Sequence, residues 1–235
     1  MNIIILGAGG VGSYFGARLL QAGHNVAFVA RGAHLEALQT EGLHVKHPHF
    51  EFEEKIRAFD LDSLADLDAT SIDLIILATK SIATREMSMH LAQWLRTQMK
   101  PPYILSLQNG VENEAILCDY FAEEYIIGGL TRKIGAHVIK PAYIEAVGTA
   151  ETILGMMHSS MENERFLEEL ALIFNQAEIP TQTTHDIKQE LWKKLIINNG
   201  VNALCALLRV QTGVLFEQNS LADVVYGLMQ ETAHA

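Results

Sequence analysis

In the first thirty residues, two continuous apolar runs are separated by a segment in which apolar residues recur at helical spacing. Residues 3–6 are apolar throughout, which is typical of a strand buried in a parallel sheet. Apolar side chains then recur at helical spacing and predict a helix over residues 10–22. Gly23 marks a turn before a second apolar strand at residues 26–30. The pattern predicts one complete β-α-β unit.

The same periodicities divide the rest of the chain into alternating strands and helices. We expect a helix at 34–40, edge strands within 42–52, an acidic loop at 60–70, a buried strand at 72–79, a helix at 81–98, a strand at 103–107, a helix opening at 111–114, a helix at 161–177, a strand at 179–184 and a helix from 186 to 205.

The segment 125–155 is rich in β-branched residues and glycine. It contains breaks at Gly128-Gly129, Gly135, Pro141 and Gly148, so we expect several extended strands that complete the sheet. The predicted fold class is therefore α/β: a Rossmann-type dinucleotide-binding domain with extra strands over residues 1–184, followed by the start of an all-helical C-terminal domain over residues 185–235.

Composition narrows the possible partners. The chain has 235 residues, is 49% hydrophobic and 19% charged, and carries a formal net charge of −11 without a basic run. This balance argues against binding to nucleic acid or to an anionic membrane. Two cysteines, no signal-peptide pattern and no apolar run near the roughly 20 residues of a membrane span predict a cytoplasmic location.

A glycine motif follows the first strand. Gly7, Gly9 and Gly12 match G-x-G-x-x-G, and the chain reads Gly7-Ala8-Gly9-Gly10-Val11-Gly12. In this motif the first glycine turns the chain, the second admits a pyrophosphate to the backbone, and the third brings helix and strand together. Its place within a β-α-β unit favours dinucleotide binding over a purely structural turn.

Three polar residues follow the ends of predicted parallel strands. Arg31 occupies the position where an acid would select NAD and an arginine suits the 2′-phosphate of NADP(H). Lys80 and Asn109 also face the crevice where such folds bind ligands. The alternatives are a solvated arginine or lysine at a strand end and an ordinary turn asparagine before Gly110.

Three histidines, His44, His47 and His49, lie in the predicted edge strands, and His47 and His49 would share one face. No cysteine or further ligand set accompanies them, so we expect a surface hairpin and no metal site.

The predicted helix after residue 186 contains an unusual polar stripe. Lys194, Asn198 and Asn202 are spaced by four and line one helix face among apolar residues. Such groups are either solvated at the surface or meet a polar ligand, and the surrounding apolar residues favour a ligand.

Taken together, these motifs resemble the 2-dehydropantoate 2-reductase (ketopantoate reductase) family over essentially the whole chain. The resemblance rests on the glycine motif, Arg31, Lys80, Gln108-Asn109-Gly110 and the run Trp192-x-Lys194-x-x-x-Asn198-x-x-x-Asn202. It implies NADPH-dependent reduction of ketopantoate to pantoate, on the route to pantothenate and coenzyme A. The alternatives are a reductase of another 2-keto acid and an NADPH-binding protein with little turnover.

The resemblance also assigns roles to residues. It implies that Lys194 is the catalytic lysine and that Asn109, Asn198 and Asn202 line the substrate site. The cofactor is expected to bind at the glycine motif, Arg31, Lys80 and Asn109. The family's helical domain supplies a further serine and glutamate in a segment that this chain does not match, so we expect residues 185–235 to be an incomplete helical domain, with a possible homodimer covering its apolar faces.

Overall fold

The computed structural model describes residues 1–234, and its contacts divide the chain into two compact units. The α/β unit comprises Met1–Gln108 and Glu112–Ile187. The helical unit comprises Asn109–Val111 and the chain from Lys188 onward. The domain boundary after residue 184 stays a prediction.

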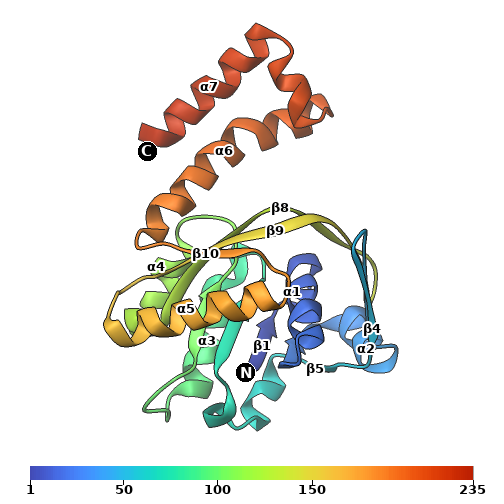
Figure 1. Ribbon diagram of the computed structural model, residues 1–235, viewed down its shortest axis with the longest axis vertical. Coiled ribbons are helices and arrows are strands. Elements are labelled where there is room, and N and C mark those ends of the chain that lie inside the picture. Colours follow the sequence, from blue (N-terminus) through green and yellow to red (C-terminus); the bar gives the residue numbers. More distant parts are fainter. Residues whose placement is uncertain (235) are drawn as a thin grey trace. The chain divides into compact units, whose positions relative to one another are not determined.

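The helices and strands follow the predicted alternation, with short 3-10 helices (η) between them (Figure 1). In chain order they are β1 Asn2–Leu6, α1 Gly10–Gln21, β2 Asn25–Val29, α2 Gly32–Thr40, β3 Leu43–His47, β4 Phe50–Glu54, β5 Arg57–Phe59, η1 Asp62–Asp66, η2 Ala69–Ser71, β6 Leu74–Leu77, η3 Ser81–Ala83, α3 Thr84–Leu95, β7 Tyr103–Ser106, α4 Asn113–Cys118, η4 Glu123–Tyr125, β8 Ile126–Lys140, β9 Tyr143–Met156, α5 Met161–Gln176, β10 Thr181–Thr183, α6 Ile187–Leu208, η5 Thr212–Phe216 and α7 Asn219–His234.

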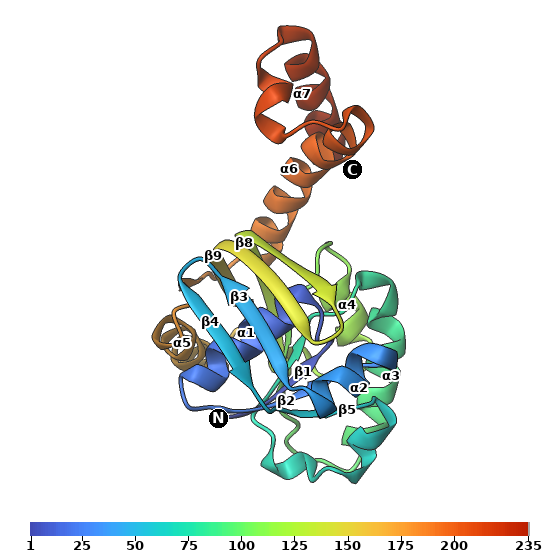
Figure 2. The same ribbon diagram turned by 90° about the vertical axis from the view of Figure 1, so that its right-hand side faces the viewer.

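The strands form one mixed sheet in the order β4-β3-β9-β8-β7-β6-β1-β2-β5, with β10 beside β9. Its centre is parallel, and Leu6 at the end of β1 is in register with Val29 of β2 and Leu77 of β6. The carboxyl ends of these three strands are therefore level. Figure 2 shows β3, β4, β8 and β9 together. The Rossmann-type α/β prediction is confirmed.

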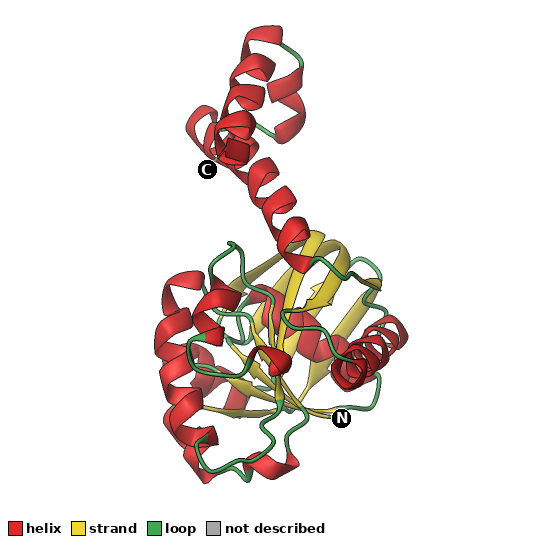
Figure 3. Cartoon of the chain, turned by 90° about the vertical axis from the view of Figure 1, so that its left-hand side faces the viewer, coloured by secondary structure: helices red, strands yellow, loops and turns green. Residues whose placement is uncertain are grey.

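Alternation along β1 explains why helices cover both faces of this sheet (Figure 3). Ile3 and Ile5 belong to a buried cluster that includes Phe15 of α1 and Phe174 of α5. The intervening Ile4 and Leu6 belong to a second buried cluster, which includes Leu91 and Leu95 of α3 and Leu117 of α4. Successive side chains of a strand point to opposite faces, so an uninterrupted apolar strand needs a helical layer on each side.

The segment 125–155 forms extended strands of the sheet, as expected, but there are two long strands where several were expected. Residues 126–156 form one long hairpin, in which β8 pairs antiparallel with β9 and only the segment around Pro141 makes a turn. The paired glycines lie within β8 because neighbours approach closely: a Cβ on Gly128 would lie 2.8 Å from Ile187 Cγ1, and one on Gly129 would lie 2.7 Å from Leu105 Cδ1. Here the glycines permit close packing and leave the strand intact.

Two smaller segments also differ from expectation. The acidic segment 60–70 contains η1 and the start of η2, because Asp60 and Asp68 accept hydrogen bonds from backbone N–H groups that follow them. The sequence analysis assigned no element after residue 205, where η5 and α7 lie. No helix in residues 1–234 is long and apolar enough to cross a membrane.

The helical unit has a small core of its own. Val201 of α6, Leu215 of η5 and Val225 of α7 are buried together. Gly200 lets α6 and α7 approach, since a Cβ there would lie 2.7 Å from Met229 Cγ. The residues around position 200 have low helix propensity, yet α6 continues through them without a break. At Gly200 the missing side chain allows α7 to pack closely against α6.

Candidate functional site

The glycine motif forms the turn from β1 into α1. Gly7 has φ +101°, a conformation that favours glycine, and a Cβ there would lie 2.8 Å from Thr79 Cγ2. A Cβ on Gly12 would lie 2.1 Å from the Gly7 carbonyl oxygen, so this glycine permits close contact between helix and strand. Gly9 differs from both, because no atom lies within 4 Å of its Cβ position. The backbone at Gly9 therefore borders open space.

Gly10 is enclosed by the β8–β9 hairpin. A Cβ at Gly10 would lie 2.0 Å from the Ala136 carbonyl oxygen of β8. Ala8 is buried, and Val11 is half-buried at the start of α1. The first N–H groups of α1 have no acceptor within the helix, and a helix N-terminus of this kind attracts phosphate.

Two exposed cations follow the level strand ends. Arg31 immediately precedes α2 and follows β2, and Lys80 follows β6. Neither side chain has a hydrogen bond or ion pair with another residue in the described part of the chain. Both cations are available to an anionic ligand, in a protein whose overall charge is strongly negative.

A buried polar network, which the sequence analysis missed, connects the ends of β6 and β7. Gln108 is 3% exposed, and its amide donates to the carbonyl and hydroxyl oxygens of Thr79 at 3.1 Å. The Thr84 hydroxyl lies 3.2 Å from Gln108 Oε1 and 2.9 Å from Asn113 Oδ1. The network fixes the residue before Asn109, and the only sequence signal was the Gln-Asn-Gly triplet.

In the helical unit, two of the predicted site residues meet. Lys194 Nζ donates a hydrogen bond of 2.8 Å to Asn109 Oδ1 across 85 residues of sequence. Lys193, the next lysine, instead donates to Glu190 Oε1 at 2.7 Å on the same helix. An ammonium and a primary amide are thereby placed side by side, which is a suitable pair for a carbonyl or carboxylate ligand.

The remaining polar stripe of α6 continues from Lys194. Asn198 is half-buried and Asn202 is exposed, and neither side chain has a hydrogen bond within residues 1–234. Asn199 lies on another face and donates to Thr232 Oγ1 of α7 at 3.3 Å. A hydrogen bond between α6 and α7 thus explains the presence of Asn199. Among the described residues, the side-chain amides of Asn198 and Asn202 have no hydrogen-bond partner.

A buried carboxyl group lies in α4. Glu114 is 1% exposed, and the Cβ position of Gly128 on β8 lies 3.4 Å from its Cγ. Burial raises the pKa of the Glu114 carboxyl, and the Ser106 hydroxyl and the backbone N–H of Glu114 oppose part of the rise. This group favours the neutral form more than an exposed glutamate does.

The edge histidines belong to a β3–β4 hairpin. His44 stacks on the Tyr143 ring at 4.1 Å. His47 Nε2 lies 2.7 Å from the Gly148 carbonyl oxygen, and its Nδ1 accepts from the His49 N–H at 3.2 Å. Within residues 1–234 no group of three His, Cys, Asp or Glu side chains is arranged to hold a metal ion.

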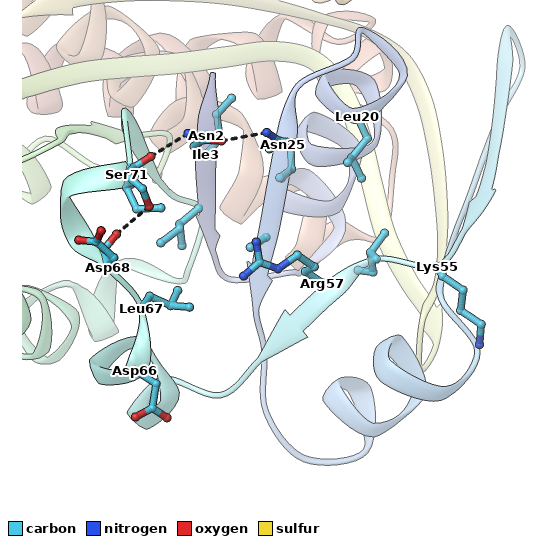
Figure 4. A pocket seen from close by; sticks show the side chains of 15 residues that line it. Asn2, Ile3, Leu20, Asn25, Lys55, Arg57, Asp66, Leu67, Asp68 and Ser71 are labelled. Carbon is cyan, nitrogen blue, oxygen red and sulfur yellow. Dashed lines mark hydrogen bonds between the residues drawn. The ribbon is translucent and has the colours of Figure 1, made fainter.

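A pocket of about 400 Å³ lies at the other ends of the central strands (Figure 4). Asn2 and Asn25, which begin β1 and β2, line it together with Arg57 and Asp68. Asn25 Nδ2 donates to Asn2 Oδ1 at 2.9 Å. Parallel sheets of this type bind ligands outside the carboxyl ends of their strands, so this pocket is not the expected dinucleotide site.

Comparison with known proteins adds independent information. Residues 3–159 match the family model described as ketopantoate reductase PanE/ApbA, and residues 186–235 match the model of its C-terminal part. A 2-dehydropantoate 2-reductase of Pyrococcus abyssi is 33% identical over 231 residues, covering 98% of this chain and 72% of that protein.

Solved structures agree with the fold. The crystal structure of 2-dehydropantoate 2-reductase from Geobacter metallireducens has a TM-score of 0.85 and 30% identity, covering 99% of this chain and 74% of that one. A D-mandelate dehydrogenase solved with NADH and anilino(oxo)acetate has a TM-score of 0.87 at 24% identity, covering 100% of this chain and 73% of that one. At that identity the likeness extends to the fold alone.

Proposed function

The chain belongs to the ketopantoate reductase PanE/ApbA family of oxidoreductases, and we propose that it reduces 2-dehydropantoate (ketopantoate) to pantoate with NADPH. In this proposal the reaction serves pantothenate and coenzyme A synthesis in the cytoplasm. Lys194 is the catalytic residue, and Asn109, Asn198 and Asn202 hold the substrate.

The observation that carries the proposal is the hydrogen bond from Lys194 Nζ to Asn109 Oδ1. A bound dihydronicotinamide supplies a hydride to the ketone carbon. Negative charge then develops on the ketone oxygen, where the Lys194 ammonium stabilises it and donates the proton that completes the alcohol. The Asn109 amide oxygen accepts the hydrogen bond from the ammonium and so holds it in place.

The two free amides of α6 suit the rest of a 2-keto acid. Asn198 and Asn202 follow Lys194 at four-residue intervals, so they extend the same helix face. Amide N–H groups can bind the substrate carboxylate and hydroxyl without adding an acid that would compete for the proton. This stripe favours a short polar keto acid without selecting its branching, which leaves another 2-keto acid as the alternative substrate.

The α/β unit fits a dinucleotide cofactor. We assign the pyrophosphate to the loop Gly7–Gly12, where open space borders Gly9 and the N-terminus of α1 is available. Arg31 is assigned to the 2′-phosphate, because it occupies the end of β2 and has no protein partner among the described residues. Lys80 is assigned to the cofactor at the end of β6.

The test is to follow NADPH absorbance with ketopantoate and with a panel of other 2-keto acids. We expect the highest kcat/KM for ketopantoate. A higher value for another acid would assign that substrate instead. NADPH binding without turnover of any acid would support the alternative of a binding protein.

A homodimer is a further proposal for the helical unit. Large apolar side chains are exposed there, including Leu207 at 79% and Ile197 at 53%. Faces of this kind are usually covered by a partner. Light scattering that gives the mass of one 26.0 kDa chain at micromolar concentration would contradict the dimer.

A further inference from the structure

Ala8, the second residue of the glycine-rich loop, is held on both sides. Its N–H donates to the Val29 carbonyl oxygen at 3.2 Å. Its carbonyl oxygen accepts from Ser13 Oγ at 2.9 Å and lies 2.7 Å from His34 Nε2. A carbonyl oxygen has two lone pairs, so this pair of donors fills both. The orientation of the Ala8 carbonyl is therefore fixed by two side chains.

The second ring nitrogen of His34 determines which form of the imidazole is present. The Ala142 N–H donates to His34 Nδ1 at 3.1 Å. A backbone N–H can only donate, so Nδ1 must carry a lone pair. Nε2 then carries the proton and donates it to the Ala8 carbonyl. His34 is consequently neutral and held in a single tautomer.

Ala142 is itself fixed in the turn of the β8–β9 hairpin. It has φ +64°, and its carbonyl oxygen accepts from the His44 N–H of β3 at 2.9 Å. The same hairpin covers the glycine-rich loop at Gly10, opposite the Ala136 carbonyl. His34 thus connects the hairpin with the loop, in addition to the close approach at Gly10.

The consequence lies in the peptide that joins Ala8 to Gly9. In a planar trans peptide the carbonyl and the N–H point in opposite directions. Because the Ala8 carbonyl points to Ser13 and His34, the Gly9 N–H must point away from them. The open space next to Gly9 is where a phosphate can approach the backbone.

We propose that His34 is a positioning residue of the cofactor site, because its neutral Nε2–H form fixes the Ala8–Gly9 peptide so that the Gly9 N–H can bind the pyrophosphate of a nicotinamide dinucleotide. This inference rests on the proposed function, since it assumes that such a dinucleotide binds at the loop. His34 acts through Ala8 and does not need to touch the cofactor.

Charged groups around His34 leave it without an ionic partner. Arg31 immediately precedes the helix that carries His34, and Glu36 lies on that helix. Lys140 and Tyr143 lie close to Ala142 in the chain, and His44 lies on β3. Lys140 Nζ is 3.6 Å from the centre of the Tyr143 ring, and His44 is stacked on the same ring. None of the described residues forms an ion pair with His34.

The experiment compares cofactor affinity in matched variants by titration calorimetry with NADP⁺. His34→Gln keeps a side-chain N–H donor that is long enough for the Ala8 carbonyl, whereas His34→Asn is too short. Ser13→Ala removes the other donor to the same carbonyl. His90→Asn makes the same chemical change on the exposed face of α3 and serves as the control. Thermal melting confirms that each variant is folded.

We expect His34→Asn and Ser13→Ala to raise the Kd for NADP⁺ by a factor of about 5 to 10, the worth of one hydrogen bond. His34→Gln should retain most of the affinity, and His90→Asn all of it.

Two results would overturn the inference. Unchanged affinity in a folded His34→Asn variant would show that His34 does not position the loop. Unchanged affinity in a folded Ser13→Ala variant would show that the orientation of the Ala8 carbonyl does not affect binding, even if His34→Asn fails to fold. In both cases tight NADP⁺ binding by the wild type would leave the proposed function standing. A wild type that binds no nicotinamide dinucleotide would overturn both.

Discussion

Lys194 and Asn109 lie 85 residues apart and are joined by a hydrogen bond of 2.8 Å between Nζ and Oδ1. Lys193, one position earlier on α6, points elsewhere and donates to Glu190. Neighbouring positions on a helix are separated by about 100° around its axis, so two adjacent lysines have separate environments. Lys194 is the residue for which we propose the chemical role, and Lys193 provides a control of identical side-chain chemistry.

Lys194→Ala should lower kcat by a factor of about 10² to 10⁴, which is the usual contribution of a general acid. The Kd for NADPH should change little, because the glycine motif, Arg31 and Lys80 lie in the α/β unit. Steady-state kinetics with ketopantoate and a separate NADPH titration measure the two effects. Lys193→Ala should be mild. Equal losses of kcat in Lys194→Ala and Lys193→Ala would refute the assignment of Lys194 as the general acid.

Arg31→Glu should reduce or reverse the preference for NADPH over NADH. The wild type is expected to bind NADPH more tightly by a factor of about 10 to 100, the worth of one charged hydrogen bond. Fluorescence titration with both cofactors measures the ratio. Arg96→Glu, an exposed arginine at the end of α3, should leave it unchanged. Equal wild-type affinity for NADPH and NADH would refute the assignment of Arg31.

Gly9→Val should abolish cofactor binding while the protein stays folded. No atom lies within 4 Å of the Cβ position, and the backbone there has φ −72° and ψ −172°, which valine adopts easily. The side chain would instead occupy the place of the pyrophosphate. Gly213→Val, also in open space but in η5, is the matched control. Normal NADPH binding by folded Gly9→Val would refute the dinucleotide site.

Glu114→Gln should change how stability depends on pH. Burial raises the pKa of Glu114 above its ordinary value of 4.5, so the folded state holds the proton more tightly than the unfolded state. The wild-type free energy of unfolding must then fall as pH rises from 4.5 through the folded-state pKa. Glutamine cannot ionise, so the variant should gain stability relative to the wild type as pH rises.

Urea denaturation at acidic and neutral pH measures this difference. Below the ordinary pKa both side chains are neutral, and the two proteins should have nearly equal stability. Glu112→Gln, the exposed neighbour, should show no comparable trend. If Glu114→Gln were less stable than the wild type at neutral pH and not in acid, the sign of the shift would be wrong.

Local patterns were sufficient for the central elements and failed for the hairpin. The apolar run Ile3–Leu6 and the glycine motif depend on neighbouring residues, so both can be recognised in the sequence. Gly128 and Gly129 resemble strand breaks in sequence. Their actual role depends on Ile187 and Leu105, which only the folded chain brings near.

The candidate site shows the same difference between what local patterns predict and what depends on tertiary contacts. Four-residue spacing placed Lys194 on the same helix face as Asn198 and Asn202, but the meeting with Asn109 needed the tertiary structure. Gln108, Thr84 and His34 act through hydrogen bonds to distant partners. Single side chains of this kind carry no periodic signal, so the sequence analysis assigned them no role.

The long hairpin has a consequence for the order in which the protein assembles. The glycine-rich loop is complete in the first dozen residues, yet Ala136 and Ala142 hold it only after more than half of the chain has been made. β3 can pair with the neighbouring β4 at once, whereas its pairing with β9 has to wait until that strand has been made. Non-local pairings of this kind slow folding, and chains grow from the N-terminus. The glycine-rich loop is thus among the first segments synthesised, but the partners that hold it are made much later.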